Sequence, residues 1–581
     1  MIYRTHNCGE LRIKDLGKKV ILCGWVRRIR DMGSIVWIDL RDRYGITQLT
    51  IYKKIASTEL LEKVNKLGRE YVIQAEGKVI ERESKNYKIP TGEIEIQVEN
   101  ISILSESEIP PFLIENETDA NEDLRLKYRY LDLRRPIMQE NLIIRHKIIS
   151  TIREFLNEKG FIEVETPILI RSTPEGARDF VVPSRLYPGH FYALPQSPQI
   201  FKQLLMISGI DKYYQIARCF RDEDLRSDRQ PEFTQLDCEL SFCTISDILT
   251  LFENLIKHLF KKILNISLNN FTILNYNEAL QKYGTDKPDL RFNLFMIDLT
   301  HKLKKIGFNL FDNSSISIAI PIKEINLSRK ILDEFSELTK INGLNGFSYI
   351  RVSENDIKSS FDKYVNKEFL LDILKELNLT KGTILIISGN DTEKVYLIGN
   401  EIIKKVITIC NIKPEVEYAP VWIIEFPMFE WDPENNRYKT VHHPFTSPLD
   451  EDIELIEKGE LEKVRAKSYD LIINGVEIGG GSIRINNLDL QNKIFKILNL
   501  TEEEIEQNFG FLLNAFKYGV PPHGGIAFGI DRLCAIMVKA NSIRDVIAFP
   551  KNQAAKDLMA NSPAPITNQQ LNELHITIKK N

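Results

Sequence analysis

Short runs of alternating apolar and polar residues occupy the first hundred positions of the chain. Five of these runs lie between residues 19 and 104, and the segment ASTELLEKVNKL, residues 56–67, separates the third run from the fourth. An alternation with period two places successive side chains on opposite faces of a strand, whereas apolar residues three or four apart favour a helix. We therefore expect five strands, with one helix between the third and the fourth.

That order of elements is the order of an OB-fold, a small barrel that commonly presents one face to oligonucleotides. The second predicted strand, IVWIDLRD, places its apolar residues on one face and Trp37, Asp39 and Arg41 on the other. Trp37 either covers an edge of the barrel or stacks on an unpaired base. The arginines at residues 27–30 favour stacking beside a basic groove.

After residue 104 the pattern of apolar and polar residues changes several times. The polar, charged stretch that includes Pro110 and Pro111 predicts a hinge or linker, and Pro136 can open a helix that ends near Gly160. Strands alternate with helices in the two segments that carry the motifs described below, and a stretch without such motifs predicts a folded insertion between them. We expect the barrel over 1–107, the hinge or linker over 108–135, the two motif-bearing segments over 136–290 and 416–550, the insertion over 291–415, and a C-terminal extension over 551–581.

Composition narrows the class of protein. With 581 residues, 43% of them hydrophobic and 27% charged, the chain is neither a small disulfide-stapled module nor wholly disordered. The formal net charge of −4 gives no overall positive field for nucleic acid, but residues 1–60 hold twelve Lys or Arg against six Asp or Glu. Seven scattered cysteines without a CxxC pair, and no run of 18 apolar residues, predict a cytoplasmic protein without a membrane span.

Three segments carry arginines in settings that suit a polyanion. CFRDEDLRSDRQPEFTQLDCEL, residues 219–240, predicts two antiparallel strands joined by a charged hairpin, and the planar guanidinium of Arg221 suits a phosphate. GGIAFGIDRLCAI places Arg532 where a glycine-rich strand passes into a helix. VEIGGGSIRI sets Glu477 and Arg484 around three glycines, which favours a main chain that lines a ligand over a glycine bulge at a sheet edge.

Together these segments resemble the three signatures of class II aminoacyl-tRNA synthetases. FIEVETPIL with Pro167 resembles the first, dimer-forming signature, FRDED the second and GIDR the third. RSTPEGARDF, QSPQIFKQLLM and HHPF narrow the resemblance to the bacterial-type aspartyl-tRNA synthetases, over essentially the whole chain. The resemblance implies an α+β protein with an N-terminal OB-fold β-barrel that binds the anticodon, an antiparallel-sheet catalytic domain and an inserted α/β domain.

The implied activity is that of an aspartate–tRNA ligase, which activates L-aspartate with ATP and passes it to the 3′ end of tRNA(Asp). Arg221, on the α-phosphate, and Arg532, which sandwiches the adenine with Phe233, are the implied catalytic residues. Asp470 and Glu477 are implied to hold Mg²⁺. The implied ATP-binding residues are Arg221, Asp222, Glu223, Gln230, Phe233, Glu477, Gly529, Ile530, Asp531 and Arg532.

Selection of aspartate should rest on cations, because aspartate differs from asparagine chiefly by one negative charge. The implied aspartate-binding residues are Glu175, Ser197, Gln199, Lys202, Arg221, Asp237, His442 and Arg484, with Lys202 and Arg484 on the side-chain carboxylate. Glu175 belongs to RSTPEGARDF, which fits a closing lid. Adjacent His442 and His443 on a strand would point to opposite faces, so we do not expect a zinc site.

In the barrel, the resemblance implies that Trp37 stacks on an anticodon base while Arg30 and Gln48 make polar contacts, and that Met32 is typical of enzymes restricted to tRNA(Asp). A homodimer is also implied. The alternatives are an asparaginyl- or lysyl-tRNA synthetase-like enzyme and a non-catalytic RNA-binding paralogue. Charging of tRNA(Asn) and the role of the insertion stay open.

Overall fold

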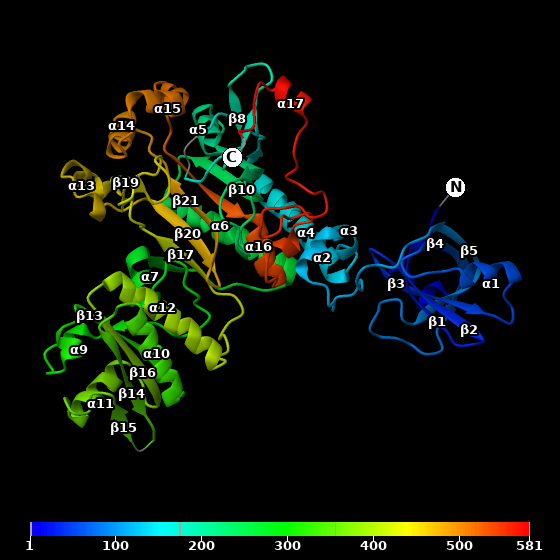
Figure 1. The fold of residues 1–581 in the computed structure, drawn as a ribbon, viewed down its shortest axis with the longest axis horizontal. Coiled ribbons are helices and arrows are strands. Elements are labelled where there is room, and N and C mark those ends of the chain that lie inside the picture. Colours follow the sequence, from blue (N-terminus) through cyan, green and yellow to red (C-terminus); the bar gives the residue numbers. More distant parts are fainter. Residues whose placement is uncertain (1–2, 173–175, 355, 580–581) are drawn as a thin grey trace. The chain divides into compact units, whose positions relative to one another are not determined.

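A computed structural model describes residues 3–172, 176–354 and 356–579 of the chain (Figure 1). The chain divides into two compact units. The first consists of Met1–Ile144 with Arg544–Pro565, and the second of Arg145–Ile543 with Ile566–Asn581. None of the described helices is long and apolar enough to cross a membrane.

The first unit contains a closed five-stranded barrel with the strand order β1-β2-β3-β5-β4. Its elements are β1 (Lys19–Asp31), β2 (Ile35–Asp42), β3 (Gly45–Tyr52), α1 (Thr58–Asn65), β4 (Val72–Glu81) and β5 (Ile94–Ser105). The helix lies between the third and fourth strands, so the predicted OB-fold is confirmed. Val36, Ile38 and Leu40 are buried in the barrel core, as the alternation in β2 predicts.

Arg41 is an exception to that pattern. It is buried, and its Nη2 atom donates to both carboxylate oxygens of Glu70 at 2.9 and 2.8 Å. Glu70 also accepts from Arg134 at 3.0 Å, and the carbonyl of Ile114 lies 3.4 Å from Arg41 Nη1. Arg41 is therefore covered by Glu70 and Ile114 at this end of β2, although it is not part of the apolar barrel core that contains Val36, Ile38 and Leu40.

The charged stretch after the barrel is folded rather than a solvated linker. It contains α2 (Glu122–Lys127) and α3 (Arg129–Asp132), and α4 (Pro136–Glu158) follows. Arg129, Asp132 and Arg135 are all buried. Because Asp132 lies three residues from each arginine, acid and base meet on one side of the helical turns and can be buried as pairs.

The second unit is built on an eight-stranded sheet with the order β11-β17-β20-β21-β22-β10-β9-β6. The strands are β6 (Ile162–Glu163), β9 (Lys212–Phe220), β10 (Glu232–Ser241), β11 (Thr272–Asn275), β17 (Pro420–Ile424), β20 (Ser468–Ile473), β21 (Val476–Ile483) and β22 (His523–Gly529). Strands β17 to β9 are antiparallel to one another, and only the edge strands β11 and β6 pair in parallel. The predicted antiparallel sheet is confirmed.

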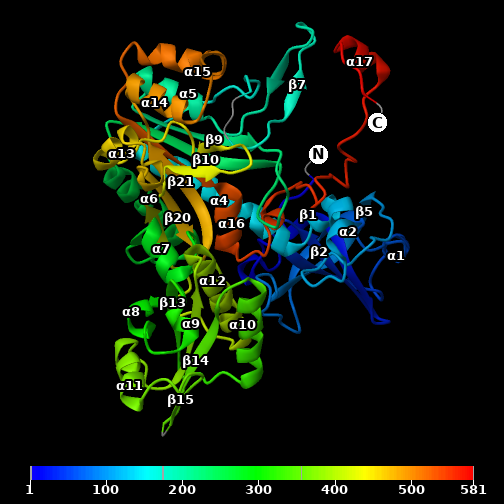
Figure 2. The same cartoon turned by 60° about the vertical axis from the view of Figure 1, so that its left-hand side comes forward.

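Helices cover this sheet and extend from it (Figure 2). They include α5 (Gln199–Ile207), α6 (Ile245–Leu259), α14 (Leu488–Ile497), α15 (Glu502–Phe516) and α16 (Ile530–Val538). Phe252 of α6 packs on Phe528 of β22 with ring centroids 5.4 Å apart, and Phe495 of α14 stacks on Phe509 of α15 at 5.0 Å. Helix α16 continues directly from β22, which aims its first turn along the sheet.

The insertion has its own five-stranded sheet with the order β12-β13-β16-β14-β15. Its elements include β12 (Ile297–Asp298), β13 (Ile316–Lys323), α10 (Arg329–Ile341), β14 (Gly346–Val352), β15 (Ile357–Ser359), α11 (Lys367–Glu376), β16 (Gly382–Gly389) and α12 (Thr392–Ile409). Leu385 and Ile387 of β16 face α10 and α12, whereas Ile384 and Ile386 face α11. The insertion is therefore a domain of helices packed on an antiparallel sheet, with a core on each face of that sheet.

The remaining strands and α-helices of the described chain are short. They are the hairpin β7 (Val181–Pro183) and β8 (Phe191–Ala193), the hairpin β18 (Phe429–Asp432) and β19 (Arg437–Thr440), α7 (Tyr276–Tyr283), α8 (Thr300–Leu303), α9 (Asn309–Asp312), α13 (Ile453–Glu457) and α17 (Asn568–Glu573). The last of these lies in the segment expected as a C-terminal extension.

Candidate active site

Two cavities adjoin on one face of the eight-stranded sheet. The first encloses about 200 Å³ and the second about 220 Å³. Both are lined by Arg221, Gln235, Glu477 and Ala527. A group bound in one cavity therefore lies next to a group bound in the other.

Strand β10 supplies the floor of both cavities, because its odd-numbered side chains share one face. Phe233 and Gln235 line the first cavity, and Gln235 and Asp237 line the second. Glu239 follows on the same face, while the intervening Leu236 and Cys238 are buried. The alternation in FTQLDCEL thus orders the polar groups of both cavities along one strand.

The three glycines of β21 line both cavities with main chain. Gly479 borders the first cavity, and Gly480 and Gly481 border the second. A Cβ atom on Gly480 would collide with the carboxylate of Asp470, and one on Gly481 would collide with the carbonyl of Gly525. The glycines therefore also permit the close approach of the neighbouring strands.

Lys202 and Arg484 meet across the second cavity. Lys202 Nζ lies 2.8 Å from Asp237 Oδ1 and 3.3 Å from Glu239 Oε2. Arg484 donates to Glu239 through Nε at 2.9 Å and Nη2 at 3.2 Å. Glu239 therefore joins the two cations, and this pairing is what permits burial of all four side chains.

Each cation keeps one N–H that no described side chain engages. Arg484 has five N–H groups, of which four point to Glu239, Ser482 and His443. Lys202 has three N–H groups, and its Nζ atom lies within 3.3 Å of two carboxylates, those of Asp237 and Glu239. Two donors therefore remain for a ligand carboxylate, which can accept two bonds side by side. The second cavity fits a small acidic ligand.

Burial and the charge of Arg484 hold the pKa of His443 well below 6.5. Its Nε2 atom lies 2.5 Å from Arg484 Nη1, so the neutral imidazole accepts from the guanidinium. Although burial opposes it, the charges of Arg484 and Lys202 lower the pKa of Glu239 to about 2. At neutral pH the cluster therefore holds a neutral histidine and an ionised glutamate.

Acidification below pH 6.5 should destabilise the protein through this histidine. An unfolded histidine has a pKa near 6.5, and the pKa of His443 is lower in the folded protein. Its stabilising contribution is therefore complete above pH 6.5 and is lost as the pH falls, by up to about 1.4 kcal/mol per pH unit. The melting temperature of His443→Asn should fall less between pH 7 and pH 5 than that of the unmodified protein. Equal falls in the two melting temperatures would contradict a lowered pKa of His443 in the folded protein.

The first cavity combines an aromatic face with two guanidinium groups. Arg221 lies over the Phe233 ring at 5.1 Å from its centroid, and its buried Nε atom has no hydrogen-bond partner in the described chain. Arg532 donates to the Glu477 carbonyl at 3.1 Å and to Asp228 at 3.2 Å. Stacking and cation–π attraction by these groups suit a flat base next to phosphates. The predicted residues Glu223, Gln230 and Gly529 line this cavity too.

Some predicted ATP-binding residues lie elsewhere or make other contacts. Ile530 is buried, and neither it nor Asp222 lines either cavity. Asp531 lines the first cavity, but its carboxylate accepts from Arg145 at 2.5 Å and from the Thr234 backbone N–H at 2.9 Å. Asp531 thus anchors α16 to α4 and to β10.

Asp470 and Glu477 form a carboxylate pair between the two cavities. Burial and the charge of Glu477 raise the pKa of Asp470, whereas Lys287 at 2.9 Å and Arg532 lower that of Glu477 against the effect of burial. The described residues contain no group of three or more His, Cys, Asp or Glu that could hold a metal ion. Two oxygen ligands fit Mg²⁺, which usually takes one or two carboxylates together with phosphates and water.

Three further predicted residues, Ser197, Gln199 and His442, line the second cavity. His443 lines it as well, so the prediction that the adjacent histidines point to opposite faces is wrong, because residues 442–443 form no strand. His442 Nε2 lies 3.7 Å from Asp470 Oδ1. Glu175 falls outside the residues that the structure describes.

In the barrel, Arg30, Trp37 and Gln48 lie together. Arg30 Nη2 donates to Gln48 at 2.9 Å and to Asp39 at 3.0 Å, and its guanidinium lies 5.9 Å from the Trp37 ring. Arg82 also donates to Gln48, at 2.8 Å. An aromatic face beside cations is the surface on which unpaired bases stack. Met32 is 67% exposed, in the turn between β1 and β2.

Sequence reasoning missed Glu239, Lys287 and Arg82. The alternation in β10 was a usable signal for Glu239, because it follows Asp237 on the same face. Lys287 and Arg82 carry no such signal, since their partners Glu477 and Gln48 are remote in the chain.

Two known protein families match this chain. A family model described as tRNA synthetases class II (D, K and N) matches residues 121–553, and an OB-fold nucleic acid binding domain matches residues 20–104. The chain belongs to the class II tRNA synthetases of the D, K and N group.

Curated relatives match the chain from end to end. An aspartate–tRNA ligase of Amoebophilus asiaticus is 52% identical over 99% of this chain and 100% of its own length. An aspartate–tRNA(Asp/Asn) ligase of Caldanaerobacter subterraneus subsp. tengcongensis is 53% identical over 99% and 98%. Among solved structures, a putative aspartyl-tRNA synthetase from Leishmania major Friedlin aligns with a TM-score of 0.61 at 18% identity, over 94% of each chain, which shows the shared fold.

Proposed function

We propose that this chain activates L-aspartate with ATP and transfers it to the 3′ end of tRNA(Asp). The observation that carries the proposal is the meeting of Lys202 and Arg484 in a cavity that shares Arg221 with a second, aromatic-lined cavity. The full-length relatives named aspartate–tRNA ligase support it.

In the proposed reaction the aspartate side-chain carboxylate accepts from Lys202 and Arg484, and Asp237 receives the ammonium group. The α-carboxylate then points toward Arg221, the cation that lines both cavities. It attacks the α-phosphorus in line, pyrophosphate leaves, and Arg221 stabilises the charge that grows on the phosphoryl oxygens. The 3′-terminal ribose hydroxyl of tRNA next attacks the carbonyl of the adenylate.

Asp470 and Glu477 would hold Mg²⁺, which neutralises phosphate charge when it is bound. Phe233 and Arg532 would hold the adenine, and Gln230 and Glu223 would orient it.

A homodimer is part of the proposal. The edge strand β6 and the segment after it expose Ile162, Ile168 and Leu169, each about half accessible. Apolar side chains at a sheet edge favour association with a second copy. Sedimentation equilibrium should give twice the chain mass, and a monomer at micromolar concentration would contradict this part. The cytoplasmic location expected from the sequence stays a prediction.

Charging of purified tRNA(Asp) and tRNA(Asn), side by side, tests the proposal as a whole. We expect aspartate on tRNA(Asp). Aspartate on neither tRNA would overturn the proposal, while aspartate on both would correct only the inference from Met32. The question is open among the relatives, because one of them is named for tRNA(Asp/Asn).

Trp37→Ala should weaken tRNA binding roughly tenfold to a hundredfold, since a stacked base contributes about 1–3 kcal/mol. Aspartate-dependent pyrophosphate exchange should not change, because it needs no tRNA. Tyr44→Ala, which removes another half-exposed aromatic side chain from the barrel, serves as the control. Filter binding of labelled tRNA measures the effect, and equal losses in both variants would contradict a stacking role for Trp37.

A further inference from the structure

Glu477 faces two cations through the same carboxylate oxygen. Lys287 Nζ lies 2.9 Å from Glu477 Oε2, and Arg532 Nη1 lies 3.8 Å from that oxygen. All three residues belong to the second unit. Lys287 is therefore within hydrogen-bonding distance of the carboxylate, whereas Arg532 is not.

The hydrogen bonds of Arg532 go to other groups. Its Nη1 atom donates to the main-chain carbonyl of Glu477 at 3.1 Å, and its Nη2 atom donates to Asp228 at 3.2 Å. In this position Arg532 lines the first cavity together with Phe233. The proposed adenine site depends on that position, because cation–π attraction requires the guanidinium to lie over the face of the base.

Lys287 comes from the loop after α7, and this loop packs against the turn between β20 and β21. A Cβ atom on Gly475, in that turn, would lie 3.4 Å from Asp289 Cβ and 3.7 Å from the Lys287 carbonyl oxygen. Gly475 has a φ of +79°, a conformation that residues with a side chain rarely adopt. Since Glu477 follows Gly475 by two residues, this contact places Lys287 beside the Glu477 carboxylate.

The Glu477 carboxylate needs a cation where it lies. It is partly buried, and the charge of buried Asp470 repels it. Lys287 lines neither cavity, so it can neutralise Glu477 without occupying the space for a ligand. Without Lys287, the unbalanced carboxylate would attract Arg532 away from Asp228.

We propose that Lys287 is a positioning residue for the adenine of ATP: by pairing with Glu477 it keeps Arg532 on Asp228 and over the base. The inference rests on the proposed use of ATP, and it assigns to Lys287 no contact with the nucleotide. A lysine that bound the phosphates directly would affect only ligands that carry phosphate.

Adenosine separates these two roles, because it has the base but no phosphate. Lys287→Met should weaken adenosine binding by about threefold to tenfold, which corresponds to the loss of one cation–π contact. Lys287→Arg, which keeps a cation beside Glu477, should bind adenosine like the unmodified protein. Saturation-transfer NMR on the full chain measures the dissociation constants. Lys287→Gln, which also removes the charge, gives the same comparison if Lys287→Met does not fold.

The double variant Lys287→Met/Glu477→Gln tests whether Glu477 and Arg532 transmit the effect. Once the carboxylate is removed, no charge at residue 477 attracts Arg532, so the double variant should bind adenosine as tightly as Glu477→Gln alone. If Lys287→Met weakens adenosine binding by the same factor with and without the Glu477→Gln change, the inference is wrong.

Lys282→Met is the matched control. Lys282 lies on α7, pairs with Glu278 at 2.7 Å and lines neither cavity. Its loss should leave the affinity for adenosine unchanged, and equal losses in Lys282→Met and Lys287→Met would overturn the inference.

The adenosine measurements also separate this inference from the proposed function. An unmodified protein that binds adenosine but forms no aspartyl-adenylate would contradict the proposed function, while the affinities of the variants would still judge Lys287. An unmodified protein that does not bind adenosine would overturn both.

Discussion

Arg221→Ala should reduce adenylate formation by about 10²–10³-fold, the usual cost of removing one preorganised donor to a charge that develops in the transition state. Arg221 borders both cavities, and its buried Nε atom has no hydrogen-bond partner in the described chain. A buried donor without a partner is costly unless a ligand uses it. Single-turnover formation of aspartyl-adenylate measures the loss.

Arg218→Ala is the matched control for this variant. Arg218 lies on β9, which ends at Phe220 directly before Arg221, but it pairs with Glu232 at 2.6 Å and lines neither cavity. Adenylate formation should stay within a few-fold of the unmodified rate. If Arg218→Ala and Arg221→Ala lose activity alike, the loss reflects damage to the strand, and the role given to Arg221 fails.

Lys202→Met should cost about 3–5 kcal/mol of aspartate-dependent catalysis, which corresponds to roughly 10²–10⁴ in kcat/KM for aspartate. The substitution keeps the length of the side chain but removes the ammonium group that contacts Asp237 and Glu239. Both carboxylates are then buried beside one cation instead of two. The KM for ATP should change little, since Lys202 does not line the first cavity.

Lys467→Met removes an ammonium group from the same unit without touching either cavity, because Lys467 pairs with Asp450 at 2.7 Å. It should leave kcat/KM for aspartate unchanged. An unchanged kcat/KM in Lys202→Met as well would show that the charge of Lys202 does not hold the substrate.

The structure refines the physical basis of amino-acid selection. The sequence led us to expect that Lys202 and Arg484 bind the side-chain carboxylate of an acidic ligand. In the structure both are already paired with Glu239, so the cluster is not an unopposed positive field. In the proposed reaction the two remaining N–H donors would distinguish aspartate from asparagine, because two carboxylate oxygens satisfy both donors and a single amide oxygen does not.

Local patterns in the sequence predicted the elements that place this site. The alternation in β10 and the passage from the glycines of β22 into α16 both appear as expected. The predictions of these elements depend on neighbours in the chain. The roles of Lys202 and Arg484 came instead from the resemblance to class II synthetases, which assigns both residues to the carboxylate of one ligand.

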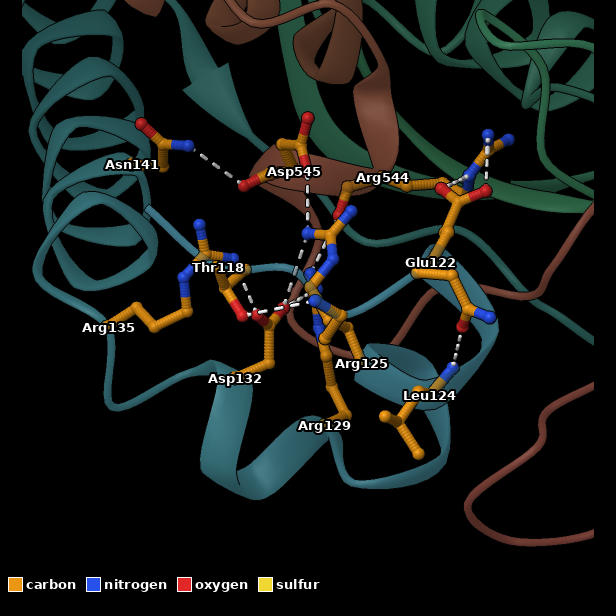
Figure 3. Close-up of polar contacts among 12 residues, drawn as sticks. Thr118, Glu122, Leu124, Arg125, Arg129, Asp132, Arg135, Asn141, Arg544 and Asp545 are labelled. Atoms are coloured by element: carbon orange, nitrogen blue, oxygen red, sulfur yellow. Dashed lines mark hydrogen bonds and ion pairs between the residues drawn. The ribbon is translucent and has the colours of Figure 1, made fainter. Parts of the chain in front are cut away.

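Contacts between remote segments were not predictable in the same way. The run DLRLKYRYLDLRR has the composition of a solvated linker, yet Arg129 and Asp132 are buried (Figure 3) because backbone carbonyls near residue 547 accept from Arg129. Arg41 is buried for the same kind of reason, since Glu70 lies against it. A charged residue is buried only where its partner is supplied, and sequence pattern does not show which remote residue that is.

Pyrophosphate exchange with aspartate, asparagine and lysine, each as the sole amino acid, tests most directly whether the cavity joining Lys202 to Arg484 selects an acidic substrate. We predict exchange with aspartate and a rate lower by about two decades or more with asparagine, because the amide leaves one buried donor unpaired. Lysine should give none. Comparable exchange with asparagine, or any preference for lysine, would contradict the account.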